Sequence, residues 1–395
     1  MFIELHLIQN FSPSNLNRDD TNNPKDCEFG GHRRARISSQ ALKRAIRRSP
    51  AFAETTGVKT GERTKWMTRP LSEKLQDAGK DKQVADSVAA AFVTAYASKM
   101  EKPGKTSVLI YFSHEEIDAV VQGLLDNWDA AIAAATDGKT LSELVKKLEK
   151  DTEARTSAPD IALFGRMLAE KPTLNIDAAC QVAHAISTHR VNMEMDFYTA
   201  VDDLQSKEED EGAGAGMMGF TNFNSACFYR YARIDWQQLI ANLGWRDPKT
   251  TKGDSQGIVQ GNQDAIRLAQ KTVEGFLRAA VDAIPSGKQN TFAAQNPTNL
   301  ALVLVRNDGK SWNLANAFEE PVRPRRDTGY VRPSIEALDA YWSELVRRRD
   351  DAGFVAVSAF TDMTRHEQAL NQLAQYSKPK MSEWIATVVE ALPRE

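Results

Sequence analysis

Residues 10–48 read NFSPSNLNRDDTNNPKDCEFGGHRRARISSQALKRAIRR, and this stretch is the most informative part of the chain. A polar loop rich in Asn, Asp, Ser and Pro leads into Gly30-Gly31, and a run of basic residues without an acid follows. The basic residues are Arg33, Arg34, Arg36, Lys43, Arg44, Arg47 and Arg48. Because the whole chain has a formal net charge of -3, this cluster is a local feature. A dense positive field in such a protein points to a polyanionic partner, with nucleic acid first.

The second half of this stretch is predicted to form an amphipathic helix. Ser38 and Ser39 are good N-caps, and neither Gly nor Pro interrupts residues 40–48. At about 100° per residue, one side of the helix carries Leu42, Ala45 and Ile46. The other side carries Gln40, Lys43, Arg44, Arg47 and Arg48. We expect the apolar side to pack on a sheet, and the basic side and free N–H groups of the cap to face phosphates. An ordinary solvated basic face is the alternative.

Length and composition set the class of protein. A chain of 395 residues has room for more than one domain, or for one domain with large insertions. With 42% hydrophobic and 26% charged residues, it has the composition of a soluble globular protein, and no run approaches the roughly 18 apolar residues that span a bilayer. The start, MFIELHLIQN, indicates a strand and not a signal peptide.

The cysteines indicate the compartment. Cys27, Cys180 and Cys227 are odd in number and far apart, which fits a reducing cytoplasm and excludes a CxxC metal site. We therefore expect a cytoplasmic protein with no membrane partner.

The order of expected elements predicts an α+β fold. Ile3, Leu5 and Leu7 alternate with polar residues and indicate a first strand. Residues 52–190 are predicted to be mostly helical, at 83–100, 115–136, 141–151 and 176–190. Strands are predicted again at 226–234, 299–306 and 354–359, with helices near 264–283 and 334–349. This order is that of a ferredoxin-like sheet, which RNA-recognition modules often use.

Two segments interrupt the pattern. Residues 205–225 combine an acidic run with several glycines and are predicted to form a flexible, exposed loop with Met217, Met218 and Phe220 at its tip. Exposed apolar groups on such a loop usually insert into something, and a disordered loop is the alternative. Residues 245–263 have the composition of a linker, and we assign no function to them.

Short words distributed along the chain resemble the CasC family, the backbone subunit of the type I-E CRISPR surveillance complex, Cascade. The N-terminal words are Ser12-Pro13-Ser14, Leu16 to Asp20, Lys25-Asp26, Phe29-Gly30-Gly31, Arg36 to Gln40 and Leu42-Lys43-Arg44. The later words are Asp160 to Leu163, Gly165-Arg166-Met167, Ala183 to Ile186, Thr188-His189, Phe197 to Leu204, Phe228 to Ala232 and Ala315 to Glu319. The resemblance covers residues 1 to about 345 and is specific, because many words recur in one order.

The resemblance implies a molecule shaped like a right hand. A ferredoxin-like (RRM-like) palm carries a helical fingers insertion and a β-hairpin thumb. The corresponding segments here are 1–50 for the first part of the palm, 51–190 for the fingers, 191–225 for the thumb and 226–395 for the rest of the palm. Copies of the subunit line up along one CRISPR RNA, each palm grips the RNA backbone, and each thumb displaces one base.

Carried onto this sequence, the resemblance also implies site residues. Arg18, Ser38, Gln40, Lys43 and Arg47 hold phosphates, and Met167 stacks on or wedges between bases. We add Lys25, Ser39 and Arg44 to the predicted RNA-binding set. The base wedge of the thumb falls on Met217, Met218 and Phe220. The implied partners are CRISPR RNA, the target DNA strand paired to it, further copies of the chain, and subunits of the CasA, CasB, CasD and CasE types.

The sequence lacks the common catalytic and cofactor motifs. It has no GxxxxGK[ST], GxGxxG or HExxH, and we expect no cofactor, no metal and no enzyme activity. His184 and His189 are expected on a helix, where they pack or cap. Asp19, Asp20 and Asp26 are expected to close turns of the N-terminal loop. The alternative is a metal-dependent RNase centred on Asp26, as in backbone subunits of type III complexes, and a further one is a helical protein that binds an acidic protein surface.

Overall fold

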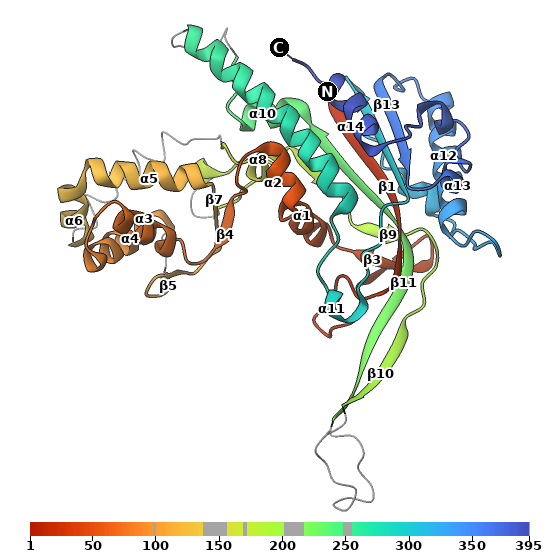
Figure 1. Cartoon of the computed structure of the whole chain (residues 1–395), viewed down its shortest axis with the longest axis horizontal. Helices are drawn as coiled ribbons and strands as arrows, with labels where there is room; N and C mark the ends of the chain where they lie inside the picture. The colour runs from red at the N-terminus through yellow and green to blue at the C-terminus, as the bar shows by residue number, and fades with distance from the viewer. Residues whose placement is uncertain (98–99, 137–155, 169–171, 201–216, 248–254, 395) are drawn as a thin grey trace, which may run out of the picture. The chain divides into compact units, whose positions relative to one another are not determined.

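The computed structural model describes residues 1–97, 100–136, 156–168, 172–200, 217–247 and 255–394 (Figure 1). The chain divides into two compact units. We name the first the sheet unit; it comprises Met1–Ser49, Val182–Arg233 and Phe276–Ala391. We name the second the helical unit; it comprises Pro50–Gln181, Ile234–Gly275 and Leu392–Glu395. Each unit is described by itself.

The sheet unit is built on one large sheet. Its strands are β1 (Phe2–Ser14), β2 (Asp26–Phe29), β3 (His32–Ile37), β9 (Ala185–Ser187), β10 (Glu194–Ala200), β11 (Met217–Asp235), β12 (Leu300–Arg306) and β13 (Phe354–Thr361). The strand order is β13-β12-β1-β11-β9-β3-β2, with β10 and the short β8 (Cys180–Val182) paired to β11. The pairs β1–β12, β12–β13, β9–β11, β3–β9 and β2–β3 are antiparallel.

Helices accompany the sheet of this unit. They are α1 (Ser39–Arg47), the C-terminal part of α10 (Ser255–Asp282), α11 (Gln289–Phe292), α12 (Val331–Arg348), α13 (Thr364–Glu367) and α14 (Met381–Glu390). The 3-10 turns η2 (Leu314–Phe318) and η3 (Leu373–Tyr376) complete the unit.

Central strand β1 is buried on both faces. Ile3, Leu5 and Leu7 lie on one face, as the alternation predicts. Glu4 and His6 point to the other face and are also fully buried, which the alternation alone does not reveal. Burying a carboxylate is tolerable only with partners. Glu4 accepts hydrogen bonds from the Tyr231 hydroxyl, the backbone N–H of residue 312 and the guanidinium of Arg306.

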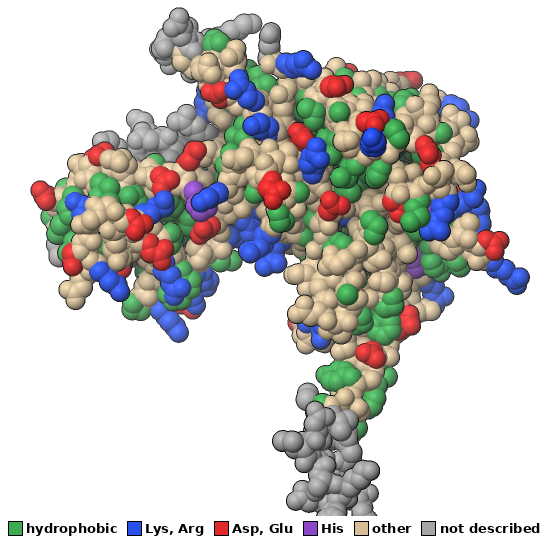
Figure 2. Space-filling view, viewed as in Figure 1, with side chains coloured by type: hydrophobic (Ala, Val, Ile, Leu, Met, Phe, Trp, Pro, Cys, Tyr) green, Lys and Arg blue, Asp and Glu red, His purple; other side chains and the backbone are tan. Residues whose placement is uncertain are grey.

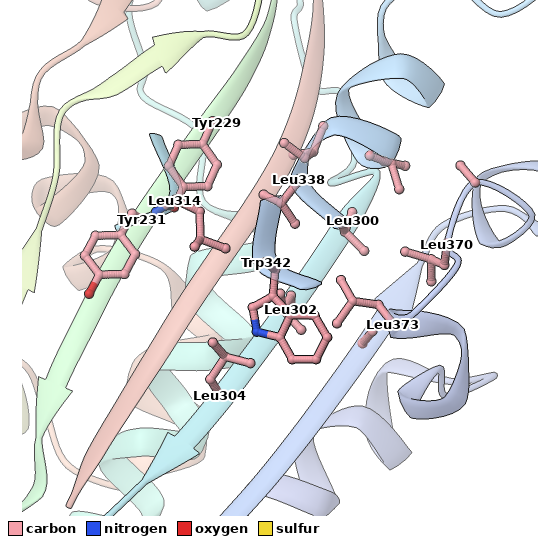
Figure 3. Close-up of a cluster of buried hydrophobic side chains, with 14 of the residues drawn as sticks. Tyr229, Tyr231, Leu300, Leu302, Leu304, Leu314, Leu338, Trp342, Leu370 and Leu373 are labelled. Carbon is pink, nitrogen blue, oxygen red and sulfur yellow. Dashed lines mark hydrogen bonds between the residues drawn. The ribbon is translucent and has the colours of Figure 1, made fainter. Parts of the chain in front are cut away.

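Two hydrophobic clusters fix the helices to the sheet. One lies between the central strands and α12, and Figure 3 shows Tyr229, Tyr231, Leu302 and Trp342 in it. The other lies beneath α1 and includes Leu42, Phe11, Ile37 and Phe228. Alternate residues of β11 therefore serve opposite faces of the sheet.

The helical unit has its own core. Its helices are α2 (Pro50–Thr56), α3 (Thr68–Asp77), α4 (Lys82–Ala97), α5 (His114–Asp126), α6 (Trp128–Thr136), α8 (Pro159–Phe164), α9 (Trp236–Asn242) and the 3-10 turn η1 (Pro172–Leu174). Short strands are β4 (Glu62–Thr64), β5 (Met100–Lys102), β6 (Lys105–Thr106) and β7 (Ile110–Phe112). Leu71, Phe92 and Phe112 are central to its buried cluster.

A buried carboxylate gives the motif Asp160 to Leu163 a structural role in this unit. The Asp160 carboxylate is fully buried and accepts hydrogen bonds from the backbone N–H of Gly61 (2.9 Å) and the Tyr111 hydroxyl (2.5 Å). Asp160 thereby ties α8 to β7 and the segment before β4. Its role in this unit is structural.

Two of the sequence motifs behind the family resemblance, Phe29-Gly30-Gly31 and Ala315 to Glu319, contact each other in the sheet unit. Gly30 has a φ of +60°, which favours glycine, and a Cβ at this position would lie 2.1 Å from the carbonyl oxygen of Glu319. The Phe29-Gly30-Gly31 turn can therefore pack against the end of η2 only without a side chain. Close packing between these two motifs is therefore the structural reason for the glycine.

The α+β class predicted from the sequence is confirmed, as are the strands expected near residues 3–7, 226–234, 299–306 and 354–359. The helix expected at 176–190 is wrong, because this stretch contains β8 and β9. Cross-strand pairing with Phe228 and Tyr229 of β11 outweighs the helix propensity of its alanines. Part of the expected linker is also wrong, since α10 begins at Ser255. The helix expected at 141–151 and the loop residues 205–216 lie outside the described residues. The ferredoxin-like arrangement and the division into palm, fingers and thumb stay predictions.

Among the described residues, no helix combines the length and the apolar character needed to cross a membrane.

Leu42→Asp should destabilise the sheet unit by on the order of several kcal/mol, because it places an unpaired charge in the cluster beneath α1. Leu42 is only 2% exposed there. Urea unfolding measures the effect, with Arg44→Asp on the exposed side of α1 as the control. Equal stability of the two variants would show that the helix faces are assigned wrongly.

Candidate nucleic-acid interface

Helix α1 starts at a well-made N-cap. Ser38 has extended backbone angles, and its hydroxyl accepts a hydrogen bond from the N–H of Ala41 (3.4 Å). The N–H of Ser38 donates to the Asn17 side chain (2.8 Å), which ties the N-terminal loop to the start of the helix. Ser38 is itself buried. Its predicted contact with phosphate therefore competes with its work as a cap.

The outer face of α1 is basic, as predicted. Leu42 and Ile46 are buried, whereas Gln40 and Arg44 are exposed and Ser39, Lys43 and Arg47 are partly exposed. The helix contains no acid, and its last turn carries Arg44 and Arg47. The exposed side thus presents several donors and no acceptor charge, which suits phosphate oxygens.

The N-terminal loop is ordered by its own side chains. The Asp19 carboxylate accepts hydrogen bonds from the backbone N–H groups of Thr21 and Asn23, both 2.9 Å. A hydrogen bond from the Thr21 hydroxyl has the largest effect on the pKa of Asp19 and lowers it, and the two backbone hydrogen bonds lower it further. The expectation that acids close turns in this loop is confirmed for Asp19. The loop carries the exposed or partly exposed side chains of Arg18 and Lys25.

The seven basic residues do not form one surface. Arg34 is fully buried, and its guanidinium donates to the carbonyl oxygens of Phe29, Ser187, Phe318 and Glu319. Burial lowers the pKa of Arg34. Arg33 is exposed and pairs with Asp26. The idea of a single seven-residue positive field is therefore wrong, because these carbonyls hold Arg34 in the interior.

The two histidines do not share a helix, contrary to the expectation. His184 lies in the turn between β8 and β9, exposed, and its Nδ1 accepts a hydrogen bond from Arg36 at 2.9 Å. His189 is buried and stacks on Tyr330 with ring centroids 3.7 Å apart. Its Nε2 accepts from the N–H of Cys227 (3.1 Å), and its Nδ1 contacts the carbonyl of Arg190 (2.8 Å). The packing role expected for His189 is thus confirmed.

Strands β10 and β11 form a projecting hairpin. They pair antiparallel from Glu194↔Phe223 to Ala200↔Met217. The placement of Met217, Met218 and Phe220 at the tip of a loop is wrong, because all three lie in β11. Tyr198 packs directly across Gly219. The absence of a side chain allows this, because a Cβ at position 219 would lie 2.5 Å from the tyrosine hydroxyl.

One face of the hairpin is apolar and exposed. The register places Phe220 opposite Phe197 and Met218 opposite Thr199, and directly paired residues share a face. Met218 and Phe220 are each 66% exposed, and Phe197 is 60% exposed. Figure 2 shows hydrophobic side chains along the surface of this hairpin. The prediction missed Met195 and Phe197, although their alternation with acids in residues 194–197 is a strand signal.

The hairpin and the N-terminal loop are joined by asparagines. The side-chain amide of Asn15 donates to the carbonyl of Asn222 (3.0 Å), and the amide of Asn222 donates to the Asn23 side chain (2.7 Å). Asn222 pairs with Met195 and therefore lies on the apolar face, two residues from Phe220. The loop that bears Arg18 and Lys25 thus adjoins the base of that face.

Met167 belongs to the helical unit. It follows Arg166, whose buried guanidinium pairs with Glu116 (2.6 Å) and donates to the carbonyl of Leu174 (2.9 Å). Gly165 precedes it with a φ of +75°, in a turn where a Cβ would lie 2.7 Å from the carbonyl oxygen of Ile176. Met167 is 83% exposed on this firmly held support. The contact of Met167 with bases stays a prediction.

Asp26 is not a free loop aspartate. It lies in β2, its carboxylate pairs with Arg33, and its carbonyl accepts a hydrogen bond from the Arg36 guanidinium (3.0 Å). In the described part of the chain, no group of three or more His, Cys, Asp or Glu side chains could hold a metal ion.

Comparison with known proteins places the chain in a class. A solved chain described as "CRISPR RNA-guided surveillance complex, pre-nicking" is 30% identical, with a TM-score of 0.78 over 99% of this chain and 100% of that one. A second, described as "CRISPR RNA-guided surveillance complex", is 24% identical with a TM-score of 0.70 over the same shares, and it supports the fold alone. The fold is therefore one found in RNA-guided surveillance complexes.

The family follows from a model described as CT1975-like protein, which matches residues 3–387. The chain belongs to this family, and the predicted resemblance to Cascade backbone subunits is confirmed. No curated protein matches the chain.

Acid should destabilise the sheet unit through His189. Burial, as the largest effect, holds the pKa of His189 below its ordinary value of 6.5. The unfolded chain then binds more protons than the folded one below about pH 6.5, so the stability lost grows as the pH falls toward the folded pKa. The variant His189→Phe keeps a ring stacked on Tyr330 but cannot take up a proton. The difference between its urea midpoint and that of wild type should therefore be constant above about pH 6.5 and change below it. A constant difference at all pH values would contradict this.

Proposed function

We propose that this chain is a non-catalytic backbone subunit of a type I-E-like Cascade complex that binds CRISPR RNA and polymerises along it. The sheet unit acts as the palm, and the β10–β11 hairpin acts as the thumb. The subunit works in the cytoplasm, where the free thiols of its three cysteines stay reduced.

One observation carries this proposal: a cationic backbone-binding surface adjoins an exposed apolar face. The loop that bears Arg18 and Lys25 is hydrogen-bonded to Asn222 on the apolar face of the hairpin. Phosphates favour the first surface and unstacked bases favour the second. A single strand can therefore contact both at once, with its backbone on the loop and α1 and a base against Met218 or Phe220.

The chemistry of the cationic surface suits a guide of any sequence. Arg, Lys, Ser and Gln contacts to phosphate carry no sequence information. The bases stay available for Watson–Crick pairing, which supplies sequence choice in RNA-guided effectors. A base displaced by the hairpin is excluded from this pairing.

The proposed partners follow from this role. They are CRISPR RNA, the target DNA strand paired to it, further copies of the chain, and Cascade subunits of the CasA, CasB, CasD and CasE types, with no membrane. Solved chains of surveillance complexes with this fold support the assembly. The RNase alternative finds no specific support, because the Asp26 carboxylate is held by Arg33.

Lys43→Glu combined with Arg47→Glu should abolish retention of co-purifying RNA while the protein still folds. Lys43 and Arg47 are partly exposed, whereas Leu42 and Ile46 are buried, so the cluster beneath the helix survives. Each lost phosphate contact should reduce the slope of log K against log salt by about 0.7 for a single strand. The ratio of absorbance at about 260 and 280 nm, with a melting curve, measures the outcome.

Arg347→Glu with Arg348→Glu is the matched control, because it reverses the same charge on exposed residues of the last turn of α12. This control should retain RNA. If the α1 variant melts normally and keeps RNA at the wild-type level, the palm assignment is wrong.

Met218→Ser combined with Phe220→Ser should weaken guide binding modestly and alter target recognition. Stacking of a base on an aromatic side chain contributes about 1–3 kcal/mol, and a Met less. We expect the wild-type complex to tolerate mismatches at regularly spaced target positions, where bases are displaced, and the variant to lose this periodicity. A tiled set of single-mismatch DNA targets measures it.

Asp196→Ser with Thr221→Ser is the control on the other face of the hairpin, because these two residues pair with each other. It should leave the tolerance profile unchanged. An unchanged profile in the Met218 and Phe220 variant would mean that the apolar face takes no part in base displacement.

A further inference from the structure

An arginine and a histidine meet at an exposed point of the sheet unit that the assigned RNA contacts do not use. Arg36 on β3 donates a hydrogen bond from its guanidinium to Nδ1 of His184, with 2.9 Å between the nitrogens. Because a guanidinium is always protonated and cannot accept, Nδ1 of His184 must be the acceptor. The imidazole is therefore neutral, with its proton on Nε2.

Strand pairing holds the two side chains on the same face of the sheet. Arg36 pairs with Ile186, and Ile37 pairs with Ala185, so His184 lies one position beyond the ladder on the side of Arg36. The N–H of Arg36 donates to the carbonyl of Lys25 (2.9 Å), which brings the N-terminal loop to the same place. Arg36 also lies two residues before the N-cap of α1.

The charges around His184 are positive. Burial first, then Arg36 and Lys25, lower the pKa of His184. On β2, the carboxylate of Asp26 pairs with Arg33, and the hydrogen bond from the Arg36 guanidinium goes to the backbone carbonyl of Asp26. The neighbouring thiol of Cys27 is kept neutral, since burial raises its pKa.

Two cations and an exposed imidazole therefore adjoin one another, and no carboxylate in the described residues bonds to Arg36 or His184. We propose that Arg36 and His184 form a further phosphate subsite for the guide RNA beside Lys25, which is already assigned to it, and that His184 takes up a proton when the phosphate binds. Protonation of Nδ1 breaks the hydrogen bond from Arg36, so that the guanidinium gives two donors in a plane and His184 gives two more, and the set can surround a phosphate.

Proton uptake follows from the charge of the ligand. In the free protein, the neighbouring cations disfavour a charged imidazole; a bound phosphate compensates them and favours it. RNA affinity should therefore rise as the pH falls, by at most tenfold per pH unit for one proton. A purely structural contact between Arg36 and His184 would not produce this linkage.

The test uses the full chain freed of co-purified RNA by high salt. A fluorescein-labelled oligouridylate serves as the probe, and its Kd is measured by anisotropy between about pH 5.5 and 8, where an ordinary histidine titrates. The variant is His184→Gln, which can still accept from Arg36 but does not titrate. His32→Gln is the matched control, because His32 is another exposed histidine of the sheet unit.

Wild type and His32→Gln should bind more tightly as the pH falls, and His184→Gln should lose that part of the gain. Arg36→Gln should reduce the salt slope by about 0.7 and also remove the pH effect. Superimposable pH profiles of wild type and His184→Gln would overturn the subsite.

This inference rests on the proposed function, and the two fail in different ways. If wild type binds the probe and the Lys43 and Arg47 variant does not, the palm stands and the pH profile of His184→Gln decides the subsite. If wild type binds no RNA at any pH, both are wrong.

Discussion

The buried guanidinium of Arg34 is the constraint on which the candidate interface depends. It donates to carbonyls of the β2–β3 turn, of β9 and of the end of η2, at 2.8 to 3.2 Å. An unsatisfied charge buried there would cost several kcal/mol, so these three segments must come together for the unit to fold. Gly30 allows the turn to approach Glu319 closely enough for these bonds. Strand β3 is thereby fixed, and β3 delivers both Arg36 and the N-cap of α1.

Much of this interface could be predicted from the sequence because it is local. The cap at Ser38 and the spacing of Leu42 and Ile46 define the helix and its faces within ten residues. The apolar run at 299–306 likewise suffices for a central strand. What could not be predicted depends on partners far along the chain. Arg34 is buried by carbonyls of Ser187 and Phe318, and no local pattern distinguishes it from the exposed Arg33.

The errors share that physical cause. Residues 176–190 have helix-forming composition, yet backbone pairing with β11 makes two short strands of them. His184 and His189 then fall in different surroundings, one exposed beside Arg36 and one buried beneath Tyr330. The hairpin was placed by family resemblance, but its apolar face follows only from the register. A shift of one residue would move Phe220 to the other face.

The net charge of the chain does not oppose the proposed role. Lys and Arg number 50 against 53 Asp and Glu, so the protein as a whole repels a polyanion slightly. At physiological ionic strength the Debye length is about 8 Å, and exposed charges beyond it are largely screened. A phosphate on α1 therefore responds chiefly to that helix, which has no acid, and to the loop that contains Lys25. Two acids of the loop have partners: Asp19 accepts hydrogen bonds within its own turn, and Asp26 pairs with Arg33. The pairing of Asp26 with Arg33 and the lack of any acid on α1 thus favour a positive local field in an acidic protein.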